Sequence, residues 1–260
     1  MSFTVITAAE KLPGPGALTD VLAAVFKLDR PTAAMRAHRC MGIIGRDMDE
    51  ASAGELAARC AESGIKTFTL PSPVPALPAA ELIKTASLEN GVFSFSCSGN
   101  SGSAGPGGIS VISAAPIKED FLKITKTTEG PSGGQRALRL GLMAVTGLPI
   151  GLGKTKEVKK EVKGSELAFY MDLMVSCNSR RLRVASGDFD FSCLKEKKTC
   201  SSQVNFRLLA AELAAFAPGA LKNTGLLAML EGRPLSQLPY DTLSDLENET
   251  LRLVLAAGLK

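Results

Sequence analysis

The chain has 260 residues, of which 45% are hydrophobic and 22% charged, so it is long enough to bury a full core without metals or disulfides. Aromatic residues make up only 5%, Trp is absent, and the net charge of +4 is spread over a long chain. Proteins that bind nucleic acids typically have a dense basic face, or aromatic side chains on which bases stack. We therefore expect no nucleic-acid partner.

Targeting signals and metal-binding patterns are not visible in the sequence. The first residues lack the basic start and apolar run of a signal peptide, and no stretch reaches the roughly 18 apolar residues of a membrane-spanning helix. His38 is the only histidine and no Cys-x-x-Cys pair occurs, so we expect no metal and no cofactor. Scattered thiols are typical of a reduced, cytoplasmic protein, and we expect them to be buried and inert. The six cysteines are Cys40, Cys60, Cys97, Cys177, Cys193 and Cys200.

The first seventy residues predict the order strand, helix, helix, strand, helix, strand. Apolar residues at three- and four-residue spacing indicate the helices, and short apolar runs between them indicate the strands. Asp29 is a suitable N-cap for the second helix, Asp49 or Ser52 for the third, and Gly64 for a left-handed C-cap. The predicted elements are Phe3–Thr7, Ala17–Leu28, a helix from Asp29 to about Arg39, Gly42–Gly45, a helix with Ala53, Leu56, Ala57 and Cys60 buried, and Ile65–Leu70.

A proline-rich stretch, Pro71–Pro78, separates this region from the rest of the chain. Four prolines in eight residues favour a stiff, extended linker. The sequence therefore predicts a domain over residues 1–70, a linker over 71–79 and a second domain over 80–260. In the second domain we expect strands at Glu81–Ser87, Val92–Cys97, Ile109–Ser113, Phe121–Thr125, Leu167–Val175 and Leu182–Phe191, a loop at Ser98–Gly108, and helices at Ser202–Ala217, Leu226–Leu230 and Leu243–Ala257.

Several stretches of the first domain carry a resemblance to a known family. They are the strand Phe3–Thr7, the helix pair around Ala17–Arg39, the strand Gly42–Gly45, the helix Glu55–Gly64 that ends in glycine, and the strand Lys66–Leu70. Their order and spacing resemble the C-terminal domain of the bacterial ribosomal stalk protein of the large subunit. The resemblance implies a compact α/β sandwich.

The surface that the ribosomal family uses for docking is not retained here. In that family, lysines at the start of the second helix dock translation factors, whereas here Pro31 and Ala34 occupy those positions. We therefore do not transfer a ribosomal function to this chain. Arg30, Arg36 and Arg39 are candidates for a different basic interaction face, and the alternative is an ordinary solvated helix surface.

The second domain has several strands followed by the helix Ser202–Ala217, and this order resembles a pleckstrin-homology-like domain over residues 80–218. The overall fold class that we expect is therefore α+β, with a stalk-like α/β sandwich followed by a β domain with C-terminal helices. Pleckstrin-homology-like folds bind lipids, peptides or proteins, so the fold alone does not select a ligand. The stretches Asn205–Leu209, Ala217–Ala220 and Tyr240–Glu247 also resemble bacterial two-domain proteins. This resemblance implies no activity.

A lysine-rich segment follows an apolar one in the middle of the chain. Gly147–Thr155 superficially matches a phosphate-binding loop, but five residues instead of four lie between Gly147 and Gly153, so we do not predict nucleotide hydrolysis. The apolar stretch Leu138–Leu152 beside clustered lysines suggests contact with an anionic membrane surface. The alternative is a buried hairpin or helix with a solvated tail. The lysines are Lys154, Lys156, Lys159, Lys160 and Lys163.

No set of residues predicts an active site. Asp188 and Asp190 flank Phe189 on a predicted strand, where two carboxylates on one face can do acid–base chemistry or simply form the solvated side of the strand. His38 lies among arginines that disfavour its protonated form, and no nucleophile is paired with it. Ser98–Gly108 lacks the glycine spacing of a nucleotide-binding loop.

We therefore expect a binding or adaptor protein that contacts partner proteins, and we assign no catalytic residues. Two hypotheses stay open beside it. One is a peripheral membrane protein that uses segment 138–163, and the other is an enzyme whose site is assembled from residues far apart in the sequence.

Overall fold

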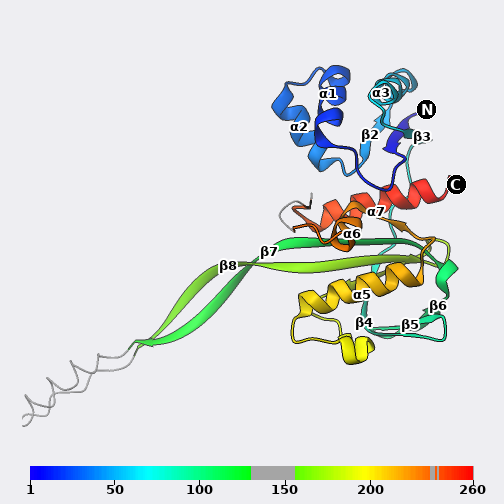
Figure 1. The fold of residues 1–260 in the computed structure, drawn as a ribbon. Helices are drawn as coiled ribbons and strands as arrows, with labels where there is room; N and C mark the ends of the chain where they lie inside the picture. Colours follow the sequence, from blue (N-terminus) through cyan, green and yellow to red (C-terminus); the bar gives the residue numbers. More distant parts are fainter. Residues whose placement is uncertain (130–155, 235–237, 239, 260) are drawn as a thin grey trace, which may run out of the picture. The chain divides into compact units, whose positions relative to one another are not determined.

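The computed structural model describes residues 1–129, 156–234, 238 and 240–259, with the backbone alone given for residues 120–129 and 156–165. It confirms a mixed α+β fold with two sheets (Figure 1). The chain divides into two compact units, one made of residues 1–118 and 167–260 and the other of residues 119–166. The predicted boundary at the proline-rich stretch stays a prediction.

The first 71 residues form a three-stranded sheet with three helices, in the predicted order. The central strand β1 pairs antiparallel with both β2 and β3. Asp49, not Ser52, caps α3, because its carboxylate accepts from the backbone N–H of Ser52 at 2.9 Å. Asp29 caps α2 as predicted, and Gly64 has the expected positive φ of 73°. The elements are β1 (Phe3–Thr7), α1 (Pro15–Phe26), α2 (Arg30–Arg39), β2 (Ile43–Met48), α3 (Glu50–Glu62) and β3 (Thr67–Pro71).

The larger sheet has the strand order β10-β7-β8-β9-β4-β5-β6. Its strands are β4 (Ala80–Glu89), β5 (Val92–Cys97), β6 (Ser101–Ala104), β7 (Ile109–Glu129), β8 (Lys156–Val175), β9 (Arg180–Ala185) and β10 (Leu221–Lys222). Its helices are α5 (Ser202–Phe216), α6 (Thr224–Leu230) and α7 (Leu243–Ala257), with 3-10 turns η1 (Pro106–Gly108) and η2 (Phe191–Lys197).

Two predictions for this region were wrong. The glycine- and serine-rich stretch expected to be a loop contains strand β6, because its small residues pair with β5. The strand predicted over Leu182–Phe191 ends at Ala185, and the chain then turns into η2. The alternation of Phe189 and Phe191 suggested a longer strand, but the two rings instead pack edge to face, 5.0 Å apart, in the core.

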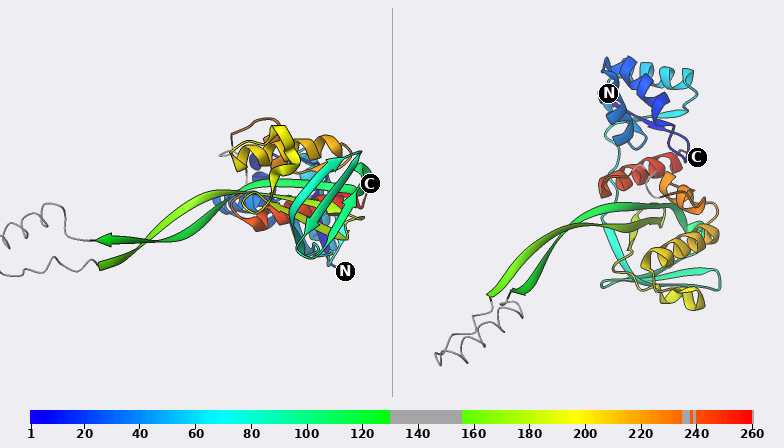
Figure 2. Two further views of the ribbon diagram at one scale, coloured as in Figure 1. Left: turned by 90° about the horizontal axis from the view of Figure 1, so that it is seen from below. Right: turned by 60° about the vertical axis from the view of Figure 1, so that its left-hand side comes forward.

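The second unit, residues 119–166, contains the C-terminal half of β7 and the N-terminal half of β8. These two strands are neighbours in the sheet order, and within this unit they form a two-stranded ribbon (Figures 1 and 2). Phe121–Thr125 therefore belongs to a strand, as predicted. Much of segment 138–163, including the Gly147–Thr155 stretch, lies outside the described residues.

Each sheet has buried residues on both faces where α7 packs against it (Figure 1). On β1, Val5 faces the cluster formed with α1, α2 and α3, whereas Ile6 faces Leu251 and Ala256 of α7. On β7, Ile112 lies in the core that α5 covers, whereas Val111 packs with Leu253 of α7. This alternation follows from the two-residue period of a strand. Helix α7 therefore lies in the interior and contributes to three separate cores.

A buried arginine on α7 holds the loop between β1 and α1. Arg252 is fully buried, and its guanidinium donates to the carbonyl oxygens of Ala9 and Glu10 and to the carboxylate of Glu249, the last at 3.2 Å. Burial lowers the pKa of Arg252, and the carboxylate of Glu249 opposes that shift. The side chain passes against Gly42, where the backbone has a φ of 80°. Gly42 thus gives the arginine access to the loop.

We expect Gly42→Ala to lower the free energy of unfolding more than Gly64→Ala does. Both glycines have positive φ, so each substitution adds left-handed strain of about 1–2 kcal/mol. A Cβ at Gly42 would also lie 2.2 Å from Cδ of Arg252, whereas at Gly64 it would meet no described atom within 4 Å. This overlap adds about 1–3 kcal/mol. Urea denaturation measures both variants, and equal losses would contradict the role of Gly42.

The ionic contact itself can be tested by a double-mutant cycle. We expect Arg252→Met to cost about 3–5 kcal/mol, because it leaves Glu249 buried without its cation. Combined with Glu249→Gln, the loss should be smaller than the sum of the two single losses. Arg46→Met is the matched control, because Arg46 also reaches α7, at Asn248, but is exposed, and we expect a change of about 0.5 kcal/mol or less. Additive losses in chemical denaturation would refute the coupling.

Candidate functional site

The three predicted arginines lie on α2, and two of them have partners within the chain. Arg30 lies 3.7 Å from the carboxylate of Asp20, and both side chains are exposed. The guanidinium of Arg36 lies 3.7 Å from the ring centroid of Phe26, a cation–π contact that commits this side chain to packing. Arg39 is exposed. A role for these residues in partner binding stays a prediction.

The lysines of the predicted membrane-contact segment can be placed only in part. Residues 156, 159, 160 and 163 belong to strand β8, so Lys156, Lys159, Lys160 and Lys163 lie on a strand and not on a helix. Lys154 lies outside the described residues. Among the helices that the structure describes, none combines the length and the apolar character needed to cross a bilayer. Contact with a membrane surface stays a prediction.

The two candidate carboxylates, Asp188 and Asp190, do not form a pair on a strand, because β9 ends before them. Asp188 lies 3.8 Å from Nζ of Lys84. Asp190 caps η2, where its carboxylate accepts from the backbone N–H and hydroxyl of Ser192. These bonds and the ammonium of Lys198 lower the pKa of Asp190. Both carboxylates have local structural partners, so they do not form the acid–base pair considered from the sequence.

The cysteines are less buried than expected. Only Cys60 is buried, and burial raises the pKa of its thiol to about 11. Cys177 and Cys200 are exposed, because each lies in a turn next to a strand or helix and not within it. Within the described ranges, no group of three or more His, Cys, Asp or Glu residues is arranged to hold a metal ion.

The most concentrated group of buried polar side chains surrounds Glu249 on α7. One oxygen of its carboxylate accepts from the backbone N–H of Thr224 at 3.0 Å, from the hydroxyl of Thr224 at 2.8 Å and from Arg252. The other oxygen accepts from the hydroxyl of Tyr240 and lies 3.4 Å from the side-chain amide of Asn223. Both carboxylate oxygens are therefore occupied by partners from within the chain.

Tyr240 is occupied in the same way. Its hydroxyl donates to Glu249 and accepts from the backbone N–H of Gly225 at 2.8 Å and from Asn223. Burial, together with the nearby charge of Glu249, raises the pKa of Tyr240 well above its usual value. A catalytic base or acid needs a lone pair or a proton within reach of a substrate. This network leaves neither available, so its geometry suits holding α6 and α7 together and not proton transfer.

A cavity of about 460 Å³ lies next to this network, and we name it the polar cavity for the lysine, histidine, arginine and threonine in its otherwise mostly apolar lining. Thr224 and Gly42 contribute to its wall, and the loop between β1 and α1 contributes another part. The backbone of that loop is fixed on two sides, by Arg252 and by a bond from the N–H of Leu12 to the hydroxyl of Thr224 at 2.9 Å. Three of the lining residues have side chains that can carry positive charge: Lys11, His38 and Arg233.

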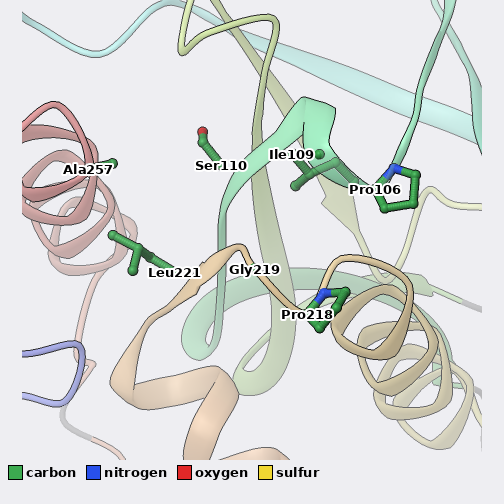
Figure 3. Close-up of a pocket in the computed structure, with 8 residues that line it drawn as sticks. Pro106, Ile109, Ser110, Pro218, Gly219, Leu221 and Ala257 are labelled. Atoms are coloured by element: carbon green, nitrogen blue, oxygen red, sulfur yellow. The ribbon is translucent and has the colours of Figure 1, made fainter. Parts of the chain in front are cut away.

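A second cavity is an apolar groove of about 500 Å³ (Figure 3). Three parts of the chain form it: η1 with the start of β7, the Pro218–Leu221 segment, and the end of α7. None of its lining residues has an ionisable side chain. These residues are Pro106, Gly107, Ile109, Ser110, Pro218, Gly219, Leu221 and Ala257.

Ser110 provides the one side-chain hydroxyl of the lining residues, and this hydroxyl is already used. It donates toward the carbonyl oxygen of Met174, at 3.2 Å, and toward the amide oxygen of Asn178. The groove therefore offers an apolar surface with no side-chain donor left for a polar ligand.

Neither cavity was predicted from the sequence, because each is assembled from segments more than a hundred residues apart. Two stretches noted in the sequence do contribute to these sites. Pro218 and Gly219 of the Ala217–Ala220 stretch line the groove, and Tyr240 begins the stretch that leads into α7. The Pro-Gly pairs at 106–107 and 218–219 were the available signal, since such pairs mark exposed turns.

Comparisons with known proteins give no family assignment. The chain matches none of the protein-family models, none of the curated proteins and none of the solved structures with which it was compared.

Proposed function

We propose that this protein is a non-enzymatic binding or adaptor protein that holds an apolar segment of a partner protein in the groove of Figure 3. The observation that carries the proposal is a groove of about 500 Å³ whose lining includes no ionisable side chain. A volume in this range accommodates a few side chains of a peptide. Grooves of this kind bind through burial of apolar surface.

The chemistry of the lining favours an apolar occupant. Ile109, Leu221 and the two prolines supply the surface, and the hydroxyl of Ser110 is engaged by Met174 and Asn178. A charged ligand would lose its hydration and gain no ion pair with the lining side chains. An aliphatic or aromatic side chain of a partner would gain about 25 cal/mol for each Å² of apolar surface that it buries.

The state of the buried polar network supports binding over catalysis. Glu249 and Tyr240 are engaged by partners within the chain, and Asp188 and Asp190 serve local structure. An enzyme would require a site formed by other residues. Binding requires only the groove.

The groove can be blocked without disturbing the core. Gly107 and Gly219 both line it, and a Cβ at either position would meet no described atom within 4 Å. We expect wild-type protein to select apolar sequences from a random peptide library displayed on phage. Gly219→Glu and Gly107→Glu should weaken binding of the selected peptides at least tenfold, because a carboxylate would occupy the apolar site. Fluorescence anisotropy with the labelled peptides measures the change.

Gly187→Glu is the matched control, because Gly187 is exposed, has the same open surroundings and lies outside the groove. It should bind as the wild type does. Selection of charged peptides would overturn the proposal, and so would equal weakening by all three variants.

A further inference from the structure

We propose that the polar cavity lined by Lys11, His38 and Arg233 binds the phosphate group of a small molecule or lipid headgroup. This site is separate from the apolar groove and does not depend on its function. The three side chains come from the β1–α1 loop, from α2 and from the residues after α6, so the fold brings them together from positions far apart in the sequence. Their convergence on one cavity is the main observation.

The charges around the cavity favour an anion. No carboxylate side chain is among its lining residues. Arg233 pairs with the neighbouring Glu231, and Nδ1 of His38 lies 3.9 Å from Asp241. Both of these carboxylates belong to exposed residues, where ion pairs contribute little. Lys11 is exposed, and the ion pairs found among the described residues do not involve it.

The backbone adds donors to these charges. Gly14 and Pro15, at the start of α1, also line the cavity, and no side chain caps this end of the helix. The first turn of α1 contains no acidic residue. Unpaired N–H groups and the positive end of a helix dipole supplement cationic side chains in binding phosphate. A Cβ added at Gly14 would also meet no described atom within 4 Å, so there is space beside this backbone.

The backbone around Lys11 is held in place by hydrogen bonds of the neighbouring loop residues. The carbonyl of Glu10 accepts from Arg252 at 2.7 Å, and the N–H of Leu12 donates to Thr224 at 2.9 Å. The residues on both sides of Lys11 are therefore fixed while its side chain is exposed. These bonds hold the backbone beside Lys11 in place before a ligand arrives, which lowers the ordering cost of binding. The cavity volume of about 460 Å³ is in the range of small-molecule sites.

The test uses the full chain and starts with inorganic phosphate, titrated at constant ionic strength with chloride as the reference anion. We expect saturable binding in NMR spectra of the ¹⁵N-labelled protein, with shifts at Gly14, Gly16 and His38. Lys11→Gln with Arg233→Gln should raise the Kd at least tenfold. Arg30→Gln with Arg39→Gln removes the same charge from exposed positions outside the cavity and should leave the Kd unchanged.

Two further probes identify the source of the phosphate. Glucose 6-phosphate represents a free phosphorylated molecule, and vesicles of phosphatidylcholine with 5% phosphatidylinositol phosphate present a headgroup. Tighter binding of either probe than of inorganic phosphate, lost in the cavity variant, supports the site and assigns its ligand. Absence of saturable phosphate binding would overturn the proposal. Equal losses in the cavity and control variants would also overturn it, because they would indicate attraction by overall charge.

Discussion

The arrangement of the larger unit depends on one buried ion pair, between Arg252 and Glu249 of α7. Neither side chain is exposed to solvent, so their charges are compensated only by each other and by the groups around them. The terminal nitrogens of Arg252 also donate to carbonyls of the β1–α1 loop, and Glu249 accepts from Thr224 and Tyr240. A buried charge without such partners would lower the free energy of unfolding by roughly several kcal/mol. The pair therefore fixes both the loop and α6 relative to α7.

The same helix has a second ionic contact, on the side of the larger sheet. Glu247 of α7 accepts from Arg183 at 3.0 Å, and Arg183 forms two bonds of 2.6 and 2.7 Å with the fully buried Asp172. Apolar burial holds α7 between the sheets, but apolar contacts are not directional and would allow the helix to shift along its axis. Directional bonds at both faces select one position along the helix axis. Leu251 and Leu253 then meet their separate cores in a single register.

Local features of the fold were predictable from the sequence, and features that depend on tertiary contacts were not. Asp29 as a cap, Gly64 as a terminator and α7 over Leu243–Ala257 follow from short-range rules, and all three are observed. Strand β6 was missed because serine and glycine have low strand propensity and pair only where β5 supplies an edge. The cavities could not be foreseen, since no local pattern reports that Lys11 and Arg233 share one wall.

The two proposed sites are connected through α7, yet the geometry favours independent binding. Glu249 holds Thr224 in the wall of the polar cavity, and Ala257, two turns further along the helix, lines the apolar groove. A helix transmits an effect between sites only if it has two arrangements that the ligands distinguish. Glu249 has both carboxylate oxygens engaged, and Arg252 is fixed to the loop, so any shift of α7 would break several buried bonds at once. We infer that α7, with the buried bonds of Glu249 and Arg252, is a rigid support and that each site binds its ligand separately.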